Sequence, residues 1–429
     1  MSDDAPSATS TKHLVEGGAA VTTAVSASHA TAAPPVEPTS TAYLGWRGDA
    51  VASPSVKRFD GSREQLHEAV HAALSSPALR EPPPFITKMT SPPPDMSLVH
   101  TREQVEWYLR RMRVTNAVGG PRCRIVWSGT MKSLGRLPRW PDDAAHVLDA
   151  ELLLTKWLDM CDDDARVDGR EVCFTMFSHR WERPSLDPKL AHPDDEDNTK
   201  AKVLATYGEL GACGVFPEHQ FDYYVWLDFA CIEQDDYPTL VEGVSMLPLY
   251  VSNCIELMFW DSPTIEYEPR AWTRVERMIA FAFCFSPLIV YVGPGYPQEE
   301  PDLDALVAKN TAFYDKGPDG KVTIKITDPL GPDASITNPA DEELIAGLKK
   351  TCESSPPMNL FLLPQVQKEA GLDASWTFDD HPEEISKALS RFFTTATCGL
   401  DTHHAFVNPT PAVKKRRALV ATFSAKLET

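Results

Sequence analysis

Between residues 172 and 292, short unbroken runs of apolar residues alternate with longer amphipathic stretches. The unbroken runs are typical of parallel strands covered on both faces, and helical spacing marks the stretches between them. Strands are predicted at 172–177, 223–229, 255–260 and 288–292. Helices are predicted at 199–210, 240–251 and 269–285. This alternation predicts an α/β fold with a doubly wound parallel sheet and right-handed crossovers.

Outside this region the patterns are simpler. Ser62 and Gln65 have the spacing of a capping box, which predicts that a helix begins at Ser62. A short strand is predicted at 124–127 and an amphipathic helix at 142–160. After residue 300 the patterns predict a strand at 321–327 and helices at 341–352 and 382–393.

Composition divides the chain further. Residues 1–58 are rich in Ser, Thr, Ala and Pro with few large apolar groups, so we expect a disordered tail. A helical N-terminal segment at 59–165 precedes the α/β domain at 166–300. Residues 301–429 are expected to form a C-terminal α+β extension.

Charge and cysteine content restrict the partners. The net charge of −20, from 61 acidic and 41 basic side chains, disfavours nucleic acid and anionic membranes. The nine scattered cysteines are typical of reduced thiols in an intracellular protein. The first dozen residues are polar and no apolar stretch follows them, so we expect no secretory signal and a cytoplasmic location. The longest apolar stretch, 278–292, is too short to span a bilayer.

Two of the predicted strands end in polar residues. Ser178, His179, Arg180 and Trp181 follow the first strand, and Asp228 ends the second. Ligands of α/β sheets bind beyond the carboxyl ends of the strands. The hydroxyl, imidazole and guanidinium would suit phosphate or ribose oxygens, and the indole would stack on a base; a polar loop explains them equally well. Asp228 would face the ligand or cap the next helix.

Glu276 is the strongest candidate for chemistry. It lies on the apolar stripe of the 269–285 helix, four residues after Trp272, and a core-facing carboxylate is costly unless it is paired or faces a cavity. An ion pair with Arg180 or His179 is the alternative, and spacing alone favours it.

Other polar residues have simpler explanations. Cys231 is interpreted as a buried thiol, and Arg270, Arg274 and Arg277 as a solvated stripe, although Arg270 would also suit a phosphate. Solvent-facing loops explain 194–197 and 403–404, and a turn explains 162–164, so no metal site is expected.

Taken together, three segments resemble the heterokaryon-incompatibility (HET) domain over about residues 170–295. That family has a Ser-Tyr-x-Trp-type end to its first strand, then Trp-Ile-Asp-x-x-Cys-Ile-(Asp/Asn)-Gln, and later Arg-x-Trp-Thr-x-x-Glu. The matching residues are Ser178 and Trp181, then Trp226, Asp228, Cys231, Ile232 and Gln234, then Arg270, Trp272, Thr273 and Glu276. Glu233 stands where the family has Asp or Asn.

HET domains are in turn similar to TIR domains, and this resemblance implies a flavodoxin-like sheet. TIR enzymes cleave NAD with the glutamate of a Trp-x-x-x-Glu helix, a spacing that Trp272 and Glu276 keep. The resemblance implies Glu276 as the catalytic residue beside the nicotinamide ribose. It also implies a substrate site made by Ser178, His179, Arg180, Trp181, Asp228, Arg270 and Trp272.

The leading hypothesis is therefore an NAD-cleaving protein of defence, cell-death or self-recognition signalling, with NAD as substrate and no other cofactor. The first alternative is a non-catalytic module of the same fold that forms homo-oligomers. The second is a domain that senses a nucleotide without cleaving it.

Overall fold

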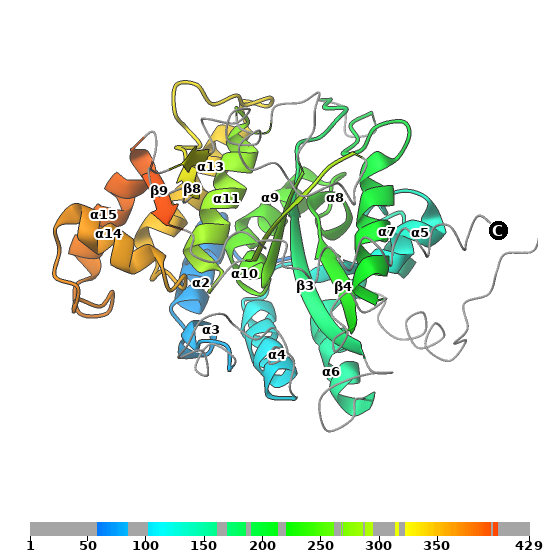
Figure 1. Ribbon diagram of the computed structural model, residues 1–429, viewed down its shortest axis with the longest axis horizontal. Coiled ribbons are helices and arrows are strands. Elements are labelled where there is room, and N and C mark those ends of the chain that lie inside the picture. Colours follow the sequence, from blue (N-terminus) through cyan, green and yellow to red (C-terminus); the bar gives the residue numbers. More distant parts are fainter. Residues whose placement is uncertain are drawn as a thin grey trace, which may run out of the picture. The chain divides into compact units, whose positions relative to one another are not determined.

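The apolar runs of the α/β region form the centre of a six-stranded sheet with the order β2-β1-β4-β3-β5-β6. Its neighbouring strands β3 and β4 lie side by side in Figure 1. The last four strands in this order, β4-β3-β5-β6, are parallel to one another. These strands are β3 (Arg170–Ser178), β4 (Gln220–Trp226), β5 (Glu256–Trp260) and β6 (Leu288–Val292). The general α/β fold is confirmed, with a sheet that is mixed and contains four parallel strands.

Two short strands extend the sheet beyond its parallel part. β1 (Arg124–Trp127) pairs antiparallel with β4, and β2 (Leu148–Asp149) pairs antiparallel with β1. The predicted strand at 124–127 is thus confirmed, and the sheet begins before residue 166, where we expected the α/β domain to start.

Successive side chains of each strand point to opposite faces of the sheet, and helices pack on both faces. On one face, Tyr207 of α7 (Thr199–Ala212) contacts Tyr223 and hydrogen-bonds Glu256. On the other face, Phe174 contacts Tyr108 of one helix, and three more helices pack on the same face. These helices are α4 (Arg102–Ala117), α6 (Ala150–Met160), α10 (Leu247–Ser252) and α11 (Ala271–Phe283). Cover on both faces explains why β3 and β5 are buried along the length that is described.

The helix that begins after Ser62 is confirmed, with its capping box. In α2 (Arg63–Leu74) the Ser62 side chain accepts from Gln65 N, and the Gln65 side chain accepts from Ser62 N. Two short helices follow at α3 (Pro77–Arg80) and, after β1, α5 (Ser128–Leu134).

The predicted helix at 142–160 is wrong in its first half. A 3-10 turn (Ala144–His146) and β2 precede α6, because pairing of β2 with β1 takes residues 148–149 into the sheet. The Asp149 carboxylate then accepts from Leu152 N and starts α6.

Two further boundaries differ from the predictions. The 240–251 helix is split at Met246 into α9 (Tyr237–Ser245) and α10, in agreement with Pro248, which has no N–H to continue a helix. The 223–229 strand ends at Trp226, and the short helix α8 (Asp228–Cys231) follows.

The C-terminal region contains a three-stranded antiparallel sheet and three helices. The strands are β7 (Tyr314–Lys316), β8 (Val322–Ile326) and β9 (Cys398–Asp401), in the order β7-β8-β9. The helices are α13 (Asp341–Ser354), α14 (Leu362–Ala370) and α15 (Pro382–Thr394). The predictions at 321–327, 341–352 and 382–393 agree with β8, α13 and α15 to within two residues, and α13 packs on α11.

The structure is a computed structural model that describes residues 58–84, 102–160, 170–185, 190–212, 220–260, 267, 269–285, 288–294, 314–316, 322–395 and 398–401. The predicted tail at 1–58, except for residue 58, lies outside these residues, as do the turn at 162–164 and the pair at 403–404. Within them, no helix combines the length and apolar character that a bilayer span requires.

Candidate functional site

Helix α11 carries the candidate catalytic residue and is buried on all sides. Every residue from Thr273 to Phe283 is buried, so the buried surface of this helix is wider than the single apolar stripe that the sequence predicted. The interpretation of Arg274 and Arg277 as a solvated stripe is wrong. Arg274 is 2% exposed and pairs with Asp333 at 2.8 Å. Arg277 is fully buried and donates to Thr327 Oγ1 at 2.8 Å.

The Glu276 carboxyl is held by a hydroxyl. Ser178 Oγ, at the end of β3, donates to Glu276 Oε2 at 2.6 Å and lies 2.5 Å from the Tyr267 hydroxyl. Glu276 is 9% exposed, and burial raises its pKa to about 8, with the charge of Asp228 adding to the rise. The Ser178 hydrogen bond and the charge of Arg270 oppose this shift without cancelling it. Glu276 therefore carries a proton at neutral pH, which a simple ion pair would not allow.

A buried lysine fixes the loop that follows Ser178. Lys200 Nζ, at the start of α7, donates to the Arg180 carbonyl at 2.5 Å and to the Pro193 carbonyl at 2.6 Å. It also lies 3.2 Å from Glu182 Oε1. The loop backbone is thus tied to a helix that packs on the sheet.

The expectation that residues 194–197 form a solvent-facing loop is wrong for Asp194. Its side chain is fully buried and accepts from the backbone N–H groups of Lys200 and Ala201. Asp194 therefore caps the N-terminal turn of α7, where a carboxylate satisfies otherwise unpaired donors.

Asp228 is the first residue of α8, whose N-cap is Leu227, so its side chain contacts this helix without capping it. Its Oδ1 accepts from Phe229 N at 2.7 Å in the first turn of α8, and its Oδ2 accepts from Trp181 Nε1 at 2.8 Å. His179 Nε2 lies 3.6 Å from Asp228 Oδ1. Burial lowers the pKa of His179 to about 4, so this imidazole is neutral at neutral pH and the contact is no ion pair.

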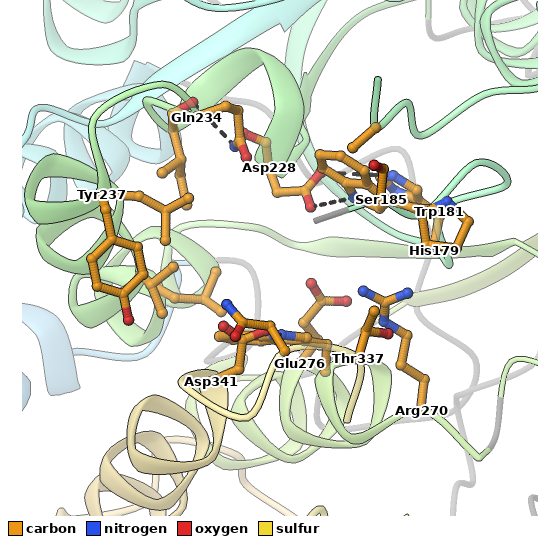
Figure 2. A pocket seen from close by; sticks show the side chains of 18 of the residues that line it. His179, Trp181, Ser185, Asp228, Gln234, Tyr237, Arg270, Glu276, Thr337 and Asp341 are labelled. Atoms are coloured by element: carbon orange, nitrogen blue, oxygen red, sulfur yellow. Dashed lines mark hydrogen bonds and ion pairs between the residues drawn. The ribbon is translucent and has the colours of Figure 1, made fainter. Parts of the chain in front are cut away.

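These elements enclose a cavity of about 380 Å³, within the range of small-molecule sites. Glu276 and Arg270 point into it from α11, opposite Trp181 and Asp228 (Figure 2). The expected site residues that line it are His179, Trp181, Asp228, Arg270, Trp272 and Glu276. Ser178 reaches it through Glu276, whereas Arg180 is not among the described residues that line it.

The cavity has an apolar part and a polar part. The polar part contains the carboxyls and the guanidinium, and the apolar part is formed by the end of β4 and by α9. Its apolar side chains are Trp226, Ile232, Leu240, Val244 and Leu247. Tyr237 stands at this end and is 49% exposed. Such a cavity suits a ligand with a flat apolar ring joined to polar groups.

Arg270 is the cation of this cavity. Among the residues that the structure describes, its guanidinium makes no hydrogen bond or ion pair, although Asp228, Glu276 and Asp341 all act on it electrostatically. Burial lowers its pKa, which means that its charge is poorly solvated. A partly buried guanidinium with no hydrogen-bond or ion-pair partner in the described part of the chain favours an anionic group of a ligand.

Several lining residues were not expected from the sequence. Thr337, Asn338 and Asp341 come from the C-terminal region, and Gln234 and Asp235 follow α8. Gln234 belongs to the motif quoted above, so its position was a usable indication. No local pattern marks residues 337–341, because only the tertiary fold brings them to α11.

Cys231 is a buried thiol, as interpreted. It is 2% exposed, and burial raises its pKa to about 12, which leaves no thiolate nucleophile at neutral pH. Within the described part of the chain, no group of three or more His, Cys, Asp or Glu is placed to hold a metal ion. Comparisons of the chain with protein-family models, curated proteins and solved structures found no match.

Proposed function

We propose that this protein carries a flavodoxin-like domain of the HET/TIR type and cleaves NAD in defence, cell-death or self-recognition signalling. The strand order supports the architecture. Counted from β3, the parallel strands have the order 2-1-3-4, which is the beginning of the flavodoxin-like order. The candidate site lies at the carboxyl ends of β3 and β4, where such folds bind nucleotides.

The observation that carries the proposal is the protonated carboxyl of Glu276, buried at the wall of a cavity of mixed polarity. Trp272, one helical turn earlier, lines the same cavity. A carboxyl of raised pKa that faces a cleft is a functional-site candidate, because a purely structural carboxyl would gain more from a cationic partner.

The proposed reaction breaks the bond between the ribose anomeric carbon and the nicotinamide nitrogen. The bonding electrons leave with nicotinamide, and the ribose ring takes up the positive charge. The Glu276 carboxylate stabilises this cation, as carboxylates do in glycoside hydrolysis. Water then bonds to the anomeric carbon and releases a proton, which Glu276 accepts, so that the products are nicotinamide and ADP-ribose. An adenine nitrogen of the same molecule would give a cyclic product instead.

The mechanism requires Glu276 to ionise when the substrate binds. The pKa of Glu276 is about 8, and the positive pyridinium ring of NAD would favour its charged form. Arg270 would pair with a phosphate of the substrate, and the indoles of Trp181 and Trp272 would lie against its rings. The binding of NAD thus prepares the carboxylate that the reaction uses.

The test is incubation of the purified full chain with NAD, followed by chromatographic measurement of nicotinamide release. We expect Glu276→Gln to lower kcat by about 10²- to 10⁴-fold, because the neutral amide cannot stabilise the cation. Glu342→Gln, an exposed acid near the cavity, serves as the matched control and should retain the activity.

Two other outcomes would favour the alternatives. Thermal stabilisation by NAD without product would indicate a nucleotide-sensing domain. Self-association that persists in Glu276→Gln, without binding or turnover of NAD, would indicate a non-catalytic assembly module.

A further inference from the structure

The C-terminal region forms one wall of the cavity, outside the segments that resemble HET domains. Thr337, Asn338 and Asp341 line the cavity together with Trp272 and Glu276. Figure 2 shows Thr337 and Asp341 on the same side of the cavity as Glu276. A carboxylate, an amide and a hydroxyl from one short segment therefore face whatever the cavity binds.

This wall is joined to the start of α11 through its backbone. Ala271 N donates to the Ser335 carbonyl at 3.0 Å, and Ser335 N donates to the Pro269 carbonyl at 2.6 Å. One turn further along α11, Arg274 pairs with Asp333 and donates to the Asp328 carbonyl at 3.1 Å. Because these bonds lie on both sides of Trp272, they hold this wall of the cavity in a fixed position relative to α11.

One side-chain bond connects the wall directly to the proposed site. Trp272 Nε1 donates to Asp341 Oδ2 at 2.7 Å, and both side chains line the cavity. A hydrogen bond to a carboxylate is stronger than one between neutral groups. Trp272 is partly exposed, so this bond restricts the rotation of an indole that neighbouring side chains do not enclose completely.

We propose that Asp341 is a positioning residue that holds the Trp272 indole in the orientation in which it contacts the ligand. This inference rests on the proposed function, because it takes the ring of NAD as the group that Trp272 contacts. Asp341 acts through Trp272 and takes no part in bond breaking. Its loss therefore weakens binding and raises KM, and kcat stays close to that of the wild type.

The test compares Asp341→Ala, Asp341→Asn and Trp272→Phe in the full chain. Asp341→Ala and Trp272→Phe should each raise the KM for NAD about tenfold, and the double variant should be no worse than the poorer single one. Asp341→Asn should stay within about threefold of the wild type, because the amide oxygen can accept the same bond. Glu342→Gln, an exposed neighbour, is the control and should not change KM.

A spectroscopic measurement reports on the bond without any turnover. In protein labelled with 5-fluorotryptophan, the Trp272 resonance is identified by its loss in Trp272→Phe. It should move in Asp341→Ala and stay near its wild-type position in Asp341→Asn. Equal defects in the Ala and Asn variants, multiplicative effects in the double variant or an unchanged KM in Asp341→Ala would each overturn the inference.

The same experiment separates the two proposals. If NAD binds without being cleaved, the dissociation constants replace KM; coupled losses then support the positioning role while the catalytic proposal fails. Cleavage of NAD with no effect of Asp341→Ala overturns the positioning role alone. A full chain that neither binds nor cleaves NAD overturns both.

Discussion

At the scale of single residues, the protonation of Glu276 is the property with the most consequences. The unfolded chain exposes this carboxyl to water and the folded chain buries it, so the two states release its proton at different pH values. Ser178 is the group that opposes this burial effect by direct contact.

The first prediction concerns stability and pH. The folded pKa of Glu276 is about 8, above the ordinary value of 4.5 that holds in the unfolded chain, so its contribution to stability is complete below pH 4.5 and is lost as the pH rises towards 8. From pH 6.5 to 8.5, the wild type should lose about 2 kcal/mol of unfolding free energy relative to Glu276→Gln. Urea denaturation at both pH values measures the difference. A constant difference between the two proteins would mean that Glu276 is ionised throughout.

The second prediction concerns Ser178→Ala. Removal of the hydroxyl that donates to the carboxylate should raise the pKa of Glu276 further, by up to about one unit. The side-chain carbon shift of Glu276, assigned in NMR spectra by its loss in Glu276→Gln, would report the titration. Tyr267→Phe should shift it in the same direction by less, since Tyr267 touches only Ser178 of this pair, and Ser245→Ala on α9 should have no effect.

At this scale the sequence indicated which residues come together but not how they are joined. The motif spacing placed Glu276 and the residues after β3 at one site, and Ser178 indeed contacts Glu276. Spacing alone favoured an ion pair for Glu276, because a sequence shows charges but not the distances between side chains. The solvated stripe of arginines was wrong for the same reason, since Asp333 and Thr327 reach α11 only in the folded chain.

At the scale of elements, α7 supports the site through the buried cation of Lys200. Its ammonium group meets the carbonyls of Arg180 and Pro193 and the carboxylate of Glu182. The loop that carries His179 and Trp181 is therefore fixed by an element on the opposite face of the sheet from α11.

The third prediction is that Lys200→Met lowers the unfolding free energy by about 3 kcal/mol, because the Glu182 carboxylate loses its cationic partner and two carbonyls lose a donor. Lys202→Met, an exposed lysine of the same helix, should change it by less than about 0.5 kcal/mol. Urea denaturation of both variants provides the comparison. Equal stabilities would show that the loop is held without the lysine.

The elements that the sequence predicted well are those with a strong local pattern. The parallel strands and α13 follow their apolar periodicity, and the capping box marks the start of α2. The helices predicted at 142–160 and 240–251 were only partly correct, because each single residue pattern covered more than one element of the structure. At 142–160, the pairing of β2 with β1 prevents residues 148–149 from being helical. At 240–251, the helix is interrupted at Met246, which lies between α9 and α10.

At the scale of the whole molecule, the C-terminal region belongs to the same folding unit as the sheet. Leu344, Ile345 and Leu348 of α13 are buried, and α13 packs on α11. The described residues, from Arg58 onward, belong to one compact unit, in agreement with these contacts. The composition change near residue 300 could not show this, because it carries no information on which surfaces pack together.

The fourth prediction follows from this packing. Ile345 is fully buried, so Ile345→Ala should cost about 2–5 kcal/mol. It should also lower the midpoint of one common unfolding transition. Hydrogen exchange should show that the amides of α11 and β5 lose protection together with those of α13. Continued protection of β5 after α13 has opened would identify the C-terminal region as a separate unit; Glu343→Ala, at an exposed position, is the control.

The burial of α11 from Thr273 to Phe283 restricts how this site can be altered. A helix that is buried along nearly all of its length accepts few substitutions. Most mutations in it would therefore cause misfolding before they could change the specificity of the site. Diversity among related sites would therefore be concentrated in the adjoining segments at 181–185 and 335–341, whose residues are exposed or partly exposed. Libraries intended to change the ligand should randomise these two segments and leave the helix intact.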